Sequence, residues 1–199
     1  MSFKEEGYKI VRNVLTQELV KYINLNFEIH ENANYFFRNP TEENPYPFGD
    51  PQSPNSFAWY CSIHSESLLR FLKPTIEKIT DTELYESYSY ARNYYHGAIL
   101  EKHIDRPSCE YSATICISKD IDWGIFIENA DGVTTEVQLY PGDMIVYRGD
   151  LLNHWRNPYQ GKTHRQVFVH YVNANGHYKN YKFDERPYLG LPATTKMRV

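Results

Sequence analysis

At 199 residues, with 41% hydrophobic and 23% charged positions, the chain has the size and balance of a single globular domain, residues 1–199. The formal net charge of −4, without any run of lysine or arginine, argues against nucleic acid as a partner. No apolar run approaches a membrane span and three cysteines without CxxC spacing argue against a disulfide framework or zinc ribbon, so we expect a cytoplasmic protein that does not bind membranes.

The first part of the chain is predicted to contain one strand and two helices. Residues 7–15 alternate apolar and polar side chains, which is typical of a strand. Thr16 is then placed to cap a helix whose apolar residues recur at helical spacing, and Ser65 or Ser67 to open a second amphipathic helix ending near Ile79.

Between these helices, residues 38–56 carry five prolines with Asn, Asp and Gly among them. A loop of this length within a domain is often functional, so we expect it to cover a site as a lid.

The remaining chain changes to strands separated by Gly, Pro, Asp and Asn turns. Helices followed by many short strands indicate an α+β fold in which the strands form a sandwich or barrel. The tail after Gly176 has no clear period and is expected to wrap the surface. The predicted strands are residues 83–95, 111–118, 125–128, 133–139, 143–147 and 165–172.

Three residues suggest a metal centre. His103 and Asp105 follow an extended segment at a spacing of two, so both side chains can point the same way. His154, after the segment GDMIVYRG, is the third candidate ligand. Two histidines and one carboxylate on one face of an octahedral ion leave open positions, as non-heme Fe(II) enzymes require. His103 and Asp105 alone are weak evidence, since such short patterns recur by chance.

Arg165 strengthens this interpretation. It lies eleven residues after His154, beyond turn signals at residues 157–158 and 161–162, and opens the apolar strand RQVFVHYV. A hairpin could return it beside the metal ligand, where its planar fork would suit the carboxylate of a dicarboxylic co-substrate. The alternative is a structural ion pair with one of the many acidic residues.

Taken together, these motifs resemble the 2-oxoglutarate/Fe(II)-dependent dioxygenase superfamily, in particular its prolyl 4-hydroxylase-like branch. The segments GYKIVRNVLTQELVKYI and LYPGDMIVYRGDLLNHW also resemble that family's N-terminal strand and helix and the turn before its second histidine. The combination is far more specific than any single piece: Tyr94-x-x-Gly97-x-x-Leu100-x-x-His103-x-Asp105, then His154, then Arg165.

The resemblance implies a double-stranded β-helix (jelly-roll, cupin-like) barrel at about residues 84–172 with N-terminal supporting helices. It implies iron held by His103, Asp105 and His154, and 2-oxoglutarate held by Arg165 with help from Tyr94. Fe(II) and the co-substrates 2-oxoglutarate and dioxygen would then hydroxylate an organic substrate, with release of succinate and CO2.

Several assignments stay open at this stage. Tyr95 could replace Tyr94, because only one of the two can face inward, and Thr114 or Cys116 could add a co-substrate contact. His170 is the rival third ligand, although it and His164 are expected to face away from iron because they alternate with Arg165. Four residues are candidates for the mouth of the site, with packing or a solvated surface as the simpler reading: Arg106, Trp123, Trp155 and Arg156.

Two other readings compete with an oxygenase. A cupin-type metal protein would usually carry more than one histidine in its first ligand strand and would leave Arg165 without a purpose. A jelly-roll binding module that stacks tyrosines on sugars would leave the whole ligand set as coincidence. If the protein is an oxygenase, the resemblance favours hydroxylation of a prolyl or other amino-acid residue, with a small molecule or a peptide as substrate.

Overall fold

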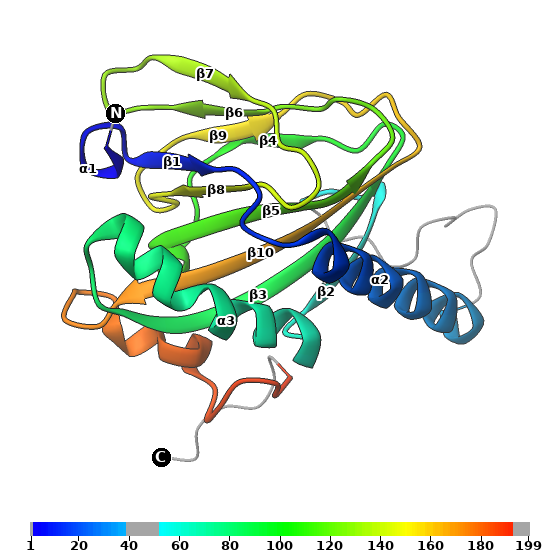
Figure 1. The fold of residues 1–199 in the computed structure, drawn as a ribbon, viewed down its shortest axis with the longest axis horizontal. Helices are drawn as coiled ribbons and strands as arrows, with labels where there is room; N and C mark the ends of the chain where they lie inside the picture. Colours follow the sequence, from blue (N-terminus) through cyan, green and yellow to red (C-terminus); the bar gives the residue numbers. More distant parts are fainter. Residues whose placement is uncertain (1, 39–51, 193–199) are drawn as a thin grey trace.

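Two antiparallel sheets form the body of the protein, whose computed structural model describes residues 2–38 and 52–192 (Figure 1). The larger sheet has the strand order β1 (Tyr8–Val11), β8 (Met144–Tyr147), β5 (Tyr111–Lys119), β10 (Thr163–Asn173), β3 (Leu84–Tyr95) and β2 (Ser56–Tyr60). The smaller sheet has the order β4 (Leu100–His103), β9 (His154–Arg156), β6 (Ile125–Glu128) and β7 (Thr134–Val137).

Two long helices, α2 (Gln17–Arg38) and α3 (Ile63–Thr80), cover the face of the larger sheet that is turned away from the smaller one (Figure 1). Their apolar stripes meet the sheet in the main hydrophobic core, where Phe27, Leu69, Ile76 and Val167 are almost fully buried. Each such side chain contributes about 1.5–3 kcal/mol relative to leaving it exposed. Three short helices complete the part of the chain that the structure describes: α1 (Phe3–Glu6), η1 (Pro107–Cys109) and η2 (Lys179–Glu185).

The central strands β3 and β10 divide their side chains between two environments. On β3, Ser89 hydrogen-bonds Ser65 of α3 and Asn93 hydrogen-bonds Glu31 of α2, whereas Tyr88 and Tyr94 face a cavity between the sheets. This division follows from the two-residue period of a strand. Which residues reach the cavity is therefore set by which face of the sheet the helices cover.

The predicted strands are confirmed within one or two residues at most ends, and the helix after Thr16 is confirmed, with the Thr16 hydroxyl accepting from the backbone N–H of Leu19. The second helix begins earlier than predicted, because Ser62 is the cap and its Oγ accepts from the N–H of Ser65 at 3.1 Å. The sequence prediction missed the short strands β2, β4 and β9, which are only three to five residues long.

Other expectations meet the structure only in part. Most of the predicted lid, residues 39–51, lies outside the described residues. The three cysteines are buried free thiols, as their spacing indicates. Of the helices in residues 2–38 and 52–192, none combines the length and apolarity needed to cross a membrane.

The C-terminal segment lies across the end of β3 and contains an unusual turn. Phe183, Asp184 and Glu185 all have positive φ, of 54°, 53° and 62°, a conformation that costs non-glycine residues roughly 1–2 kcal/mol each. Arg186 follows, nearly fully buried, and its guanidinium pairs with the buried Glu66 at 2.6 Å. This buried pair anchors the segment directly after the strained turn.

Candidate metal centre and co-substrate pocket

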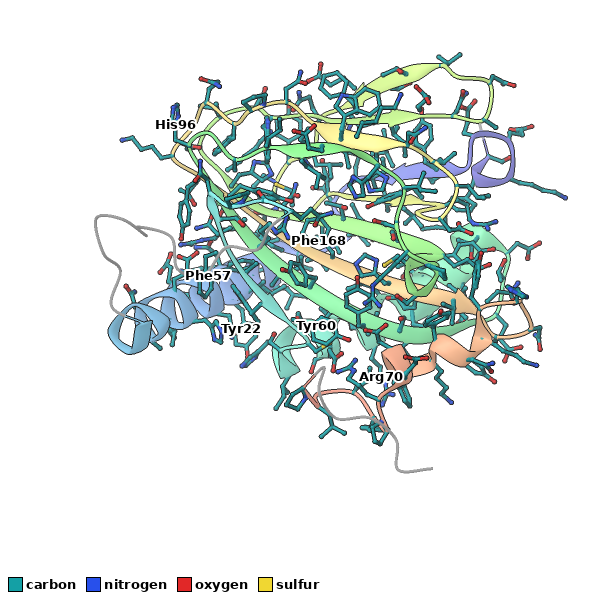
Figure 2. All side chains as sticks on the ribbon, turned by 180° about the vertical axis from the view of Figure 1, so that it is seen from behind. Tyr22, Phe57, Tyr60, Arg70, His96 and Phe168 are labelled. Atoms are coloured by element: carbon teal, nitrogen blue, oxygen red, sulfur yellow. The ribbon has the colours of Figure 1, made fainter. Side chains whose placement is uncertain are left out.

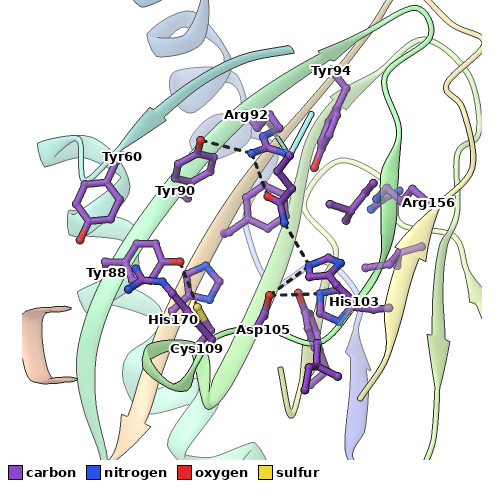
Figure 3. Close-up of a pocket in the computed structure, with 18 residues that line it drawn as sticks. Tyr60, Tyr88, Tyr90, Arg92, Tyr94, His103, Asp105, Cys109, Arg156 and His170 are labelled. Atoms are coloured by element: carbon purple, nitrogen blue, oxygen red, sulfur yellow. Dashed lines mark hydrogen bonds and ion pairs between the residues drawn. The ribbon is translucent and has the colours of Figure 1, made fainter. Parts of the chain in front are cut away.

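A cavity of about 410 Å3 lies between the two sheets and contains the predicted metal ligands (Figure 3). Most of its wall on the larger sheet comes from alternate residues of β3 and β10, with Tyr60 of β2 and Tyr147 of β8 beside them. Phe168, one of them, lies near the middle of the molecule in Figure 2. The residues that β3 and β10 contribute to this wall are Tyr88, Tyr90, Arg92, Tyr94, Phe168 and His170.

His103, Asp105 and His154 meet in this cavity. His103 ends β4 and is paired in register with His154, the first residue of the neighbouring strand β9. The Nε2 atoms of both histidines lie 3.5 Å from Oδ1 of Asp105, and one ligand atom from each residue falls within 4.8 Å of the others. The structure therefore brings the three predicted ligands together.

Backbone carbonyls orient both imidazoles. Nδ1 of His103 lies 2.7 Å from the carbonyl of Glu101, and Nδ1 of His154 lies 2.9 Å from the carbonyl of Leu152. A carbonyl oxygen can only accept, so each Nδ1 carries a proton, and Nε2 is the ring atom left free to offer its lone pair to a metal in the centre of the site. This is the tautomer that a metal-binding histidine needs.

Asp105 is held as a carboxylate with one oxygen toward the histidines. Burial by itself raises the pKa of Asp105, but hydrogen bonds to His103 and His154 outweigh burial and hold that pKa well below its usual range. Ser112 of β5 donates to the other oxygen, Oδ2, at 2.8 Å. Gly149 leaves room for the carboxylate, since a Cβ there would lie 2.4 Å from Oδ2.

Ser112 connects Asp105 to a second histidine. Its Oγ lies 2.9 Å from Nδ1 of His170, whose ring stacks on Tyr88 with 4.5 Å between centroids. Because the Asp105 carboxylate and the carbonyl of Cys109, both within reach of the Ser112 hydroxyl, can only accept, the consistent arrangement has His170 donating to Ser112. The sequence analysis considered His170 only as a rival metal ligand and missed Ser112, because no local pattern distinguishes Ser112 from the other serines.

Ser112→Ala is expected to weaken Fe(II) binding about 10- to 100-fold, the usual cost of losing an outer hydrogen-bond partner of a metal ligand. Asp105 would lose the donor that directs its other oxygen toward the histidines. Anaerobic Fe(II) titration measures this affinity. Thr114→Val on the same strand is the matched control, since Thr114 is buried but makes no contact with Asp105. Equal affinities of Ser112→Ala and the unchanged protein would contradict this role.

Arg156 is one of the three arginines that line this cavity, with Arg92 and Arg106. It lies two residues after His154 on β9, is 2% exposed, and donates from Nη1 to the carbonyl of Trp123 at 2.6 Å. Within the described ranges no carboxylate lies within 4.0 Å of its guanidinium, and burial lowers its pKa. A buried guanidinium without an acidic partner is costly, so the site favours an anionic ligand beside Arg156.

The structure does not bring Arg165, the predicted carboxylate anchor, to the cavity. Its guanidinium instead bonds Asn24, Glu28 and Glu31 of α2, at 2.8, 3.3 and 2.9 Å. Arg165 is on the helix-covered face of β10, and the alternative reading, a structural ion pair, describes this contact. His170 faces the cavity, contrary to expectation. The predicted alternation between the two residues is correct, but the faces were assigned in reverse.

The structure also separates the remaining candidates. Tyr94 lines the cavity, whereas the Tyr95 hydroxyl reaches Glu31 of α2, so Tyr94 is the inward member of the pair. Thr114 and Cys116 are buried outside the cavity wall. Arg106 and Arg156 line the cavity, Trp123 packs against Tyr94 behind it, and Trp155 stacks on Phe126 of the smaller sheet.

The sequence prediction placed Arg156 only at the mouth of the site, with a solvent-exposed surface position as the alternative. A signal for it existed, because strand alternation puts residues 154 and 156 on one face once 154–156 is recognised as a strand.

Comparison with protein-family models found no match, and neither did comparison with curated protein sequences. Solved structures do match over most of the chain. A prolyl-4-hydroxylase from Pseudomonas putida has a TM-score of 0.65 at 15% identity, covering 86% of this chain and 95% of that one. HygX from Streptomyces hygroscopicus, with nickel, 2-oxoglutarate and hygromycin B bound, has a TM-score of 0.64 at 12% identity, covering 87% and 85%.

A prolyl hydroxylase from Trichoplax adhaerens, in complex with a peptide fragment of the hypoxia inducible factor oxygen degradation domain, has a TM-score of 0.59 at 9% identity and covers 86% of each chain. Identities this low show a shared fold. The fold of this chain is therefore the one found in these 2-oxoglutarate and prolyl hydroxylase structures.

Proposed function

We propose that this protein is an Fe(II)- and 2-oxoglutarate-dependent oxygenase that hydroxylates an organic substrate and releases succinate and CO2. The observation that carries the proposal is one cavity holding both a two-histidine, one-carboxylate cluster and a buried arginine without an acidic partner. The cluster suits Fe(II) with positions left open, and the arginine suits the far carboxylate of a dicarboxylic acid.

The residues present fit both groups. His103, Asp105 and His154 would hold the iron, each already oriented by a hydrogen bond to its other polar atom. Arg156, in place of Arg165, would bind the distal carboxylate of 2-oxoglutarate, with Tyr94 bordering the same part of the cavity. When bound, iron and 2-oxoglutarate supply the oxidation of a C–H bond by dioxygen. The chain's own task is to orient these groups and to exclude water around them.

We also propose that the two sheets form a double-stranded β-helix. Strands β3 to β10 form two four-stranded layers in the orders β8-β5-β10-β3 and β4-β9-β6-β7, and consecutive strands change layer except at the β6–β7 hairpin. These orders support a double-stranded β-helix, with β1 and β2 added at the edges of the larger layer and α2 and α3 as supports. All 199 residues would then form one oxygenase domain.

The position of Arg156 argues against the two competing functions, a cupin-type metal protein and a sugar-binding module. A cupin-type metal protein or a sugar-binding jelly roll needs no buried guanidinium beside its metal ligands or aromatic rings. The substrate is proposed to be a small molecule or a peptide, as in the similar structures with hygromycin B or a peptide bound. A prolyl or other amino-acid residue remains the first class to test.

Anaerobic addition of Fe(II) and 2-oxoglutarate together is expected to give the visible charge-transfer band of the iron–2-oxoglutarate chelate. Neither component alone should give it. The band's titration yields the 2-oxoglutarate affinity used in the experiments below. If no band forms, and 2-oxoglutarate does not raise the Tm of the metal-loaded protein, the oxygenase proposal fails.

A further inference from the structure

The end of the cavity opposite Arg156 contains another arginine, Arg106, that the proposed chemistry does not use. Arg106 directly follows Asp105 and lines the cavity, and in Figure 3 Tyr60 and Tyr88 lie on the other side of His103 from Arg156. Tyr60, Tyr88 and His170 form a continuous aromatic stack, with centroid distances of 5.0 Å and 4.5 Å. This end of the cavity is an aromatic wall with a cation at its edge.

A carboxylate of the same chain, that of Asp184, is already bound to Arg106. Arg106 donates from Nη1 and Nη2 to the two oxygens of Asp184 at 2.9 and 2.8 Å, and the Tyr60 hydroxyl donates to the same carboxylate. The guanidinium also lies 4.5 Å from the centre of the Tyr88 ring. A two-pronged arginine contact plus a hydroxyl donor is a complete carboxylate-binding arrangement.

Asp184 comes from outside the two sheets and is held there in an unfavourable conformation. It is the middle of three consecutive residues with positive φ, and the chain is anchored immediately afterwards by the buried Arg186–Glu66 pair. The contact with Arg106 and Tyr60 must therefore offset backbone strain in this turn. The carboxylate of a ligand would therefore displace Asp184 from Arg106 more easily than it would displace an unstrained partner.

We propose that Arg106 and Tyr60 form the subsite for a carboxylate of the substrate, and that Asp184 occupies this subsite until the substrate displaces it. This inference rests on the proposed oxygenase function and deepens it. The substrate class is an organic acid whose apolar or aromatic body lies along Tyr88 while its carboxylate is held by Arg106. Arg106 directly follows the proposed metal ligand Asp105 in the chain. A substrate whose carboxylate is bound to Arg106 can therefore extend its body toward the metal.

The probes are phenylacetate and phenylacetamide, which share an aromatic body and differ in the charge of one group. Binding is measured by calorimetry, anaerobically, with Fe(II) and saturating 2-oxoglutarate so that Arg156 is already occupied. The variants are Asp184→Ala, Asp184→Asn and Arg106→Gln. All must first give the iron–2-oxoglutarate band, whose absence from the unchanged protein would refute the oxygenase function and not this subsite.

Asp184→Ala and Asp184→Asn are expected to bind phenylacetate at least tenfold more tightly than the unchanged protein does, without a matching gain for phenylacetamide. Adding Arg106→Gln to Asp184→Ala should remove the preference for the acid. The subsite is refuted if neither Asp184 variant binds phenylacetate more tightly, if both probes gain equally, or if the gain survives the loss of Arg106. A purely structural ion pair would give one of these refuting results.

Discussion

Arg156→Gln is expected to raise the Kd for 2-oxoglutarate by roughly two to three and a half orders of magnitude. Removing one partner of a buried ion pair costs about 3–5 kcal/mol, and each 1.4 kcal/mol is about tenfold in affinity. Fe(II) binding should change far less, because Arg156 is not among the metal-ligand cluster. Titration of the charge-transfer band gives the 2-oxoglutarate affinity, and Fe(II) titration alone gives the metal affinity.

Arg165→Gln is the matched control for this experiment. Arg165 is on β10, the strand that follows the strand of Arg156 in the chain, and it forms ion pairs with Glu28 and Glu31 of α2. Its loss should therefore lower the Tm and leave the 2-oxoglutarate affinity unchanged. The reverse outcome, with Arg165→Gln losing 2-oxoglutarate and Arg156→Gln retaining it, would restore the assignment made from sequence. Equal weakening of metal and 2-oxoglutarate in Arg156→Gln would instead indicate a structural arginine.

His154→Ala is expected to weaken Fe(II) binding by more than the roughly 10- to 100-fold that loss of an outer partner costs, and to abolish metal-dependent turnover. The side chain is a direct member of the cluster, with its Nε2 3.5 Å from Asp105. Anaerobic Fe(II) titration and succinate formation measure the two effects.

A second donor set shares Asp105 and provides the test of this assignment. Asp105, Cys109 and His170 also bring ligand atoms within 4.8 Å of one another. However, Nδ1 of His170 is engaged by Ser112, and burial raises the pKa of the Cys109 thiol, which disfavours the thiolate that a metal needs. Cys109→Ser should therefore keep Fe(II) affinity. If it loses the metal and His154→Ala does not, the site lies at the second set.

His170→Ala should have an intermediate effect. It removes the donor to Ser112 but no ligand, so its cost in metal affinity should not exceed that of Ser112→Ala. The sequence alone made His170 a rival third ligand, and the structure makes it a residue that positions Asp105 through Ser112.

Most of the elements could be predicted from local patterns. The strand-like stretches around 84–95 and 163–173 are long and rich in tyrosine and valine, and their two-residue period is readable in one dimension. Strands β4 and β9, which carry His103 and His154, are too short to show a period. Their pairing with each other creates them, and that pairing is a tertiary contact.

The sequence by itself identified the three candidate metal ligands that the structure brings together, because His103 and Asp105 are two residues apart in the chain and His154 completes a specific motif. It also determined that Arg165 and His170 lie on opposite faces of one strand, as the period of a strand requires. Only the tertiary structure decided which face is inside. Helix α2 covers one side of β10 and presents Glu28 and Glu31 to Arg165, so the cavity receives His170, and the buried arginine without an acidic partner is Arg156 on the other sheet.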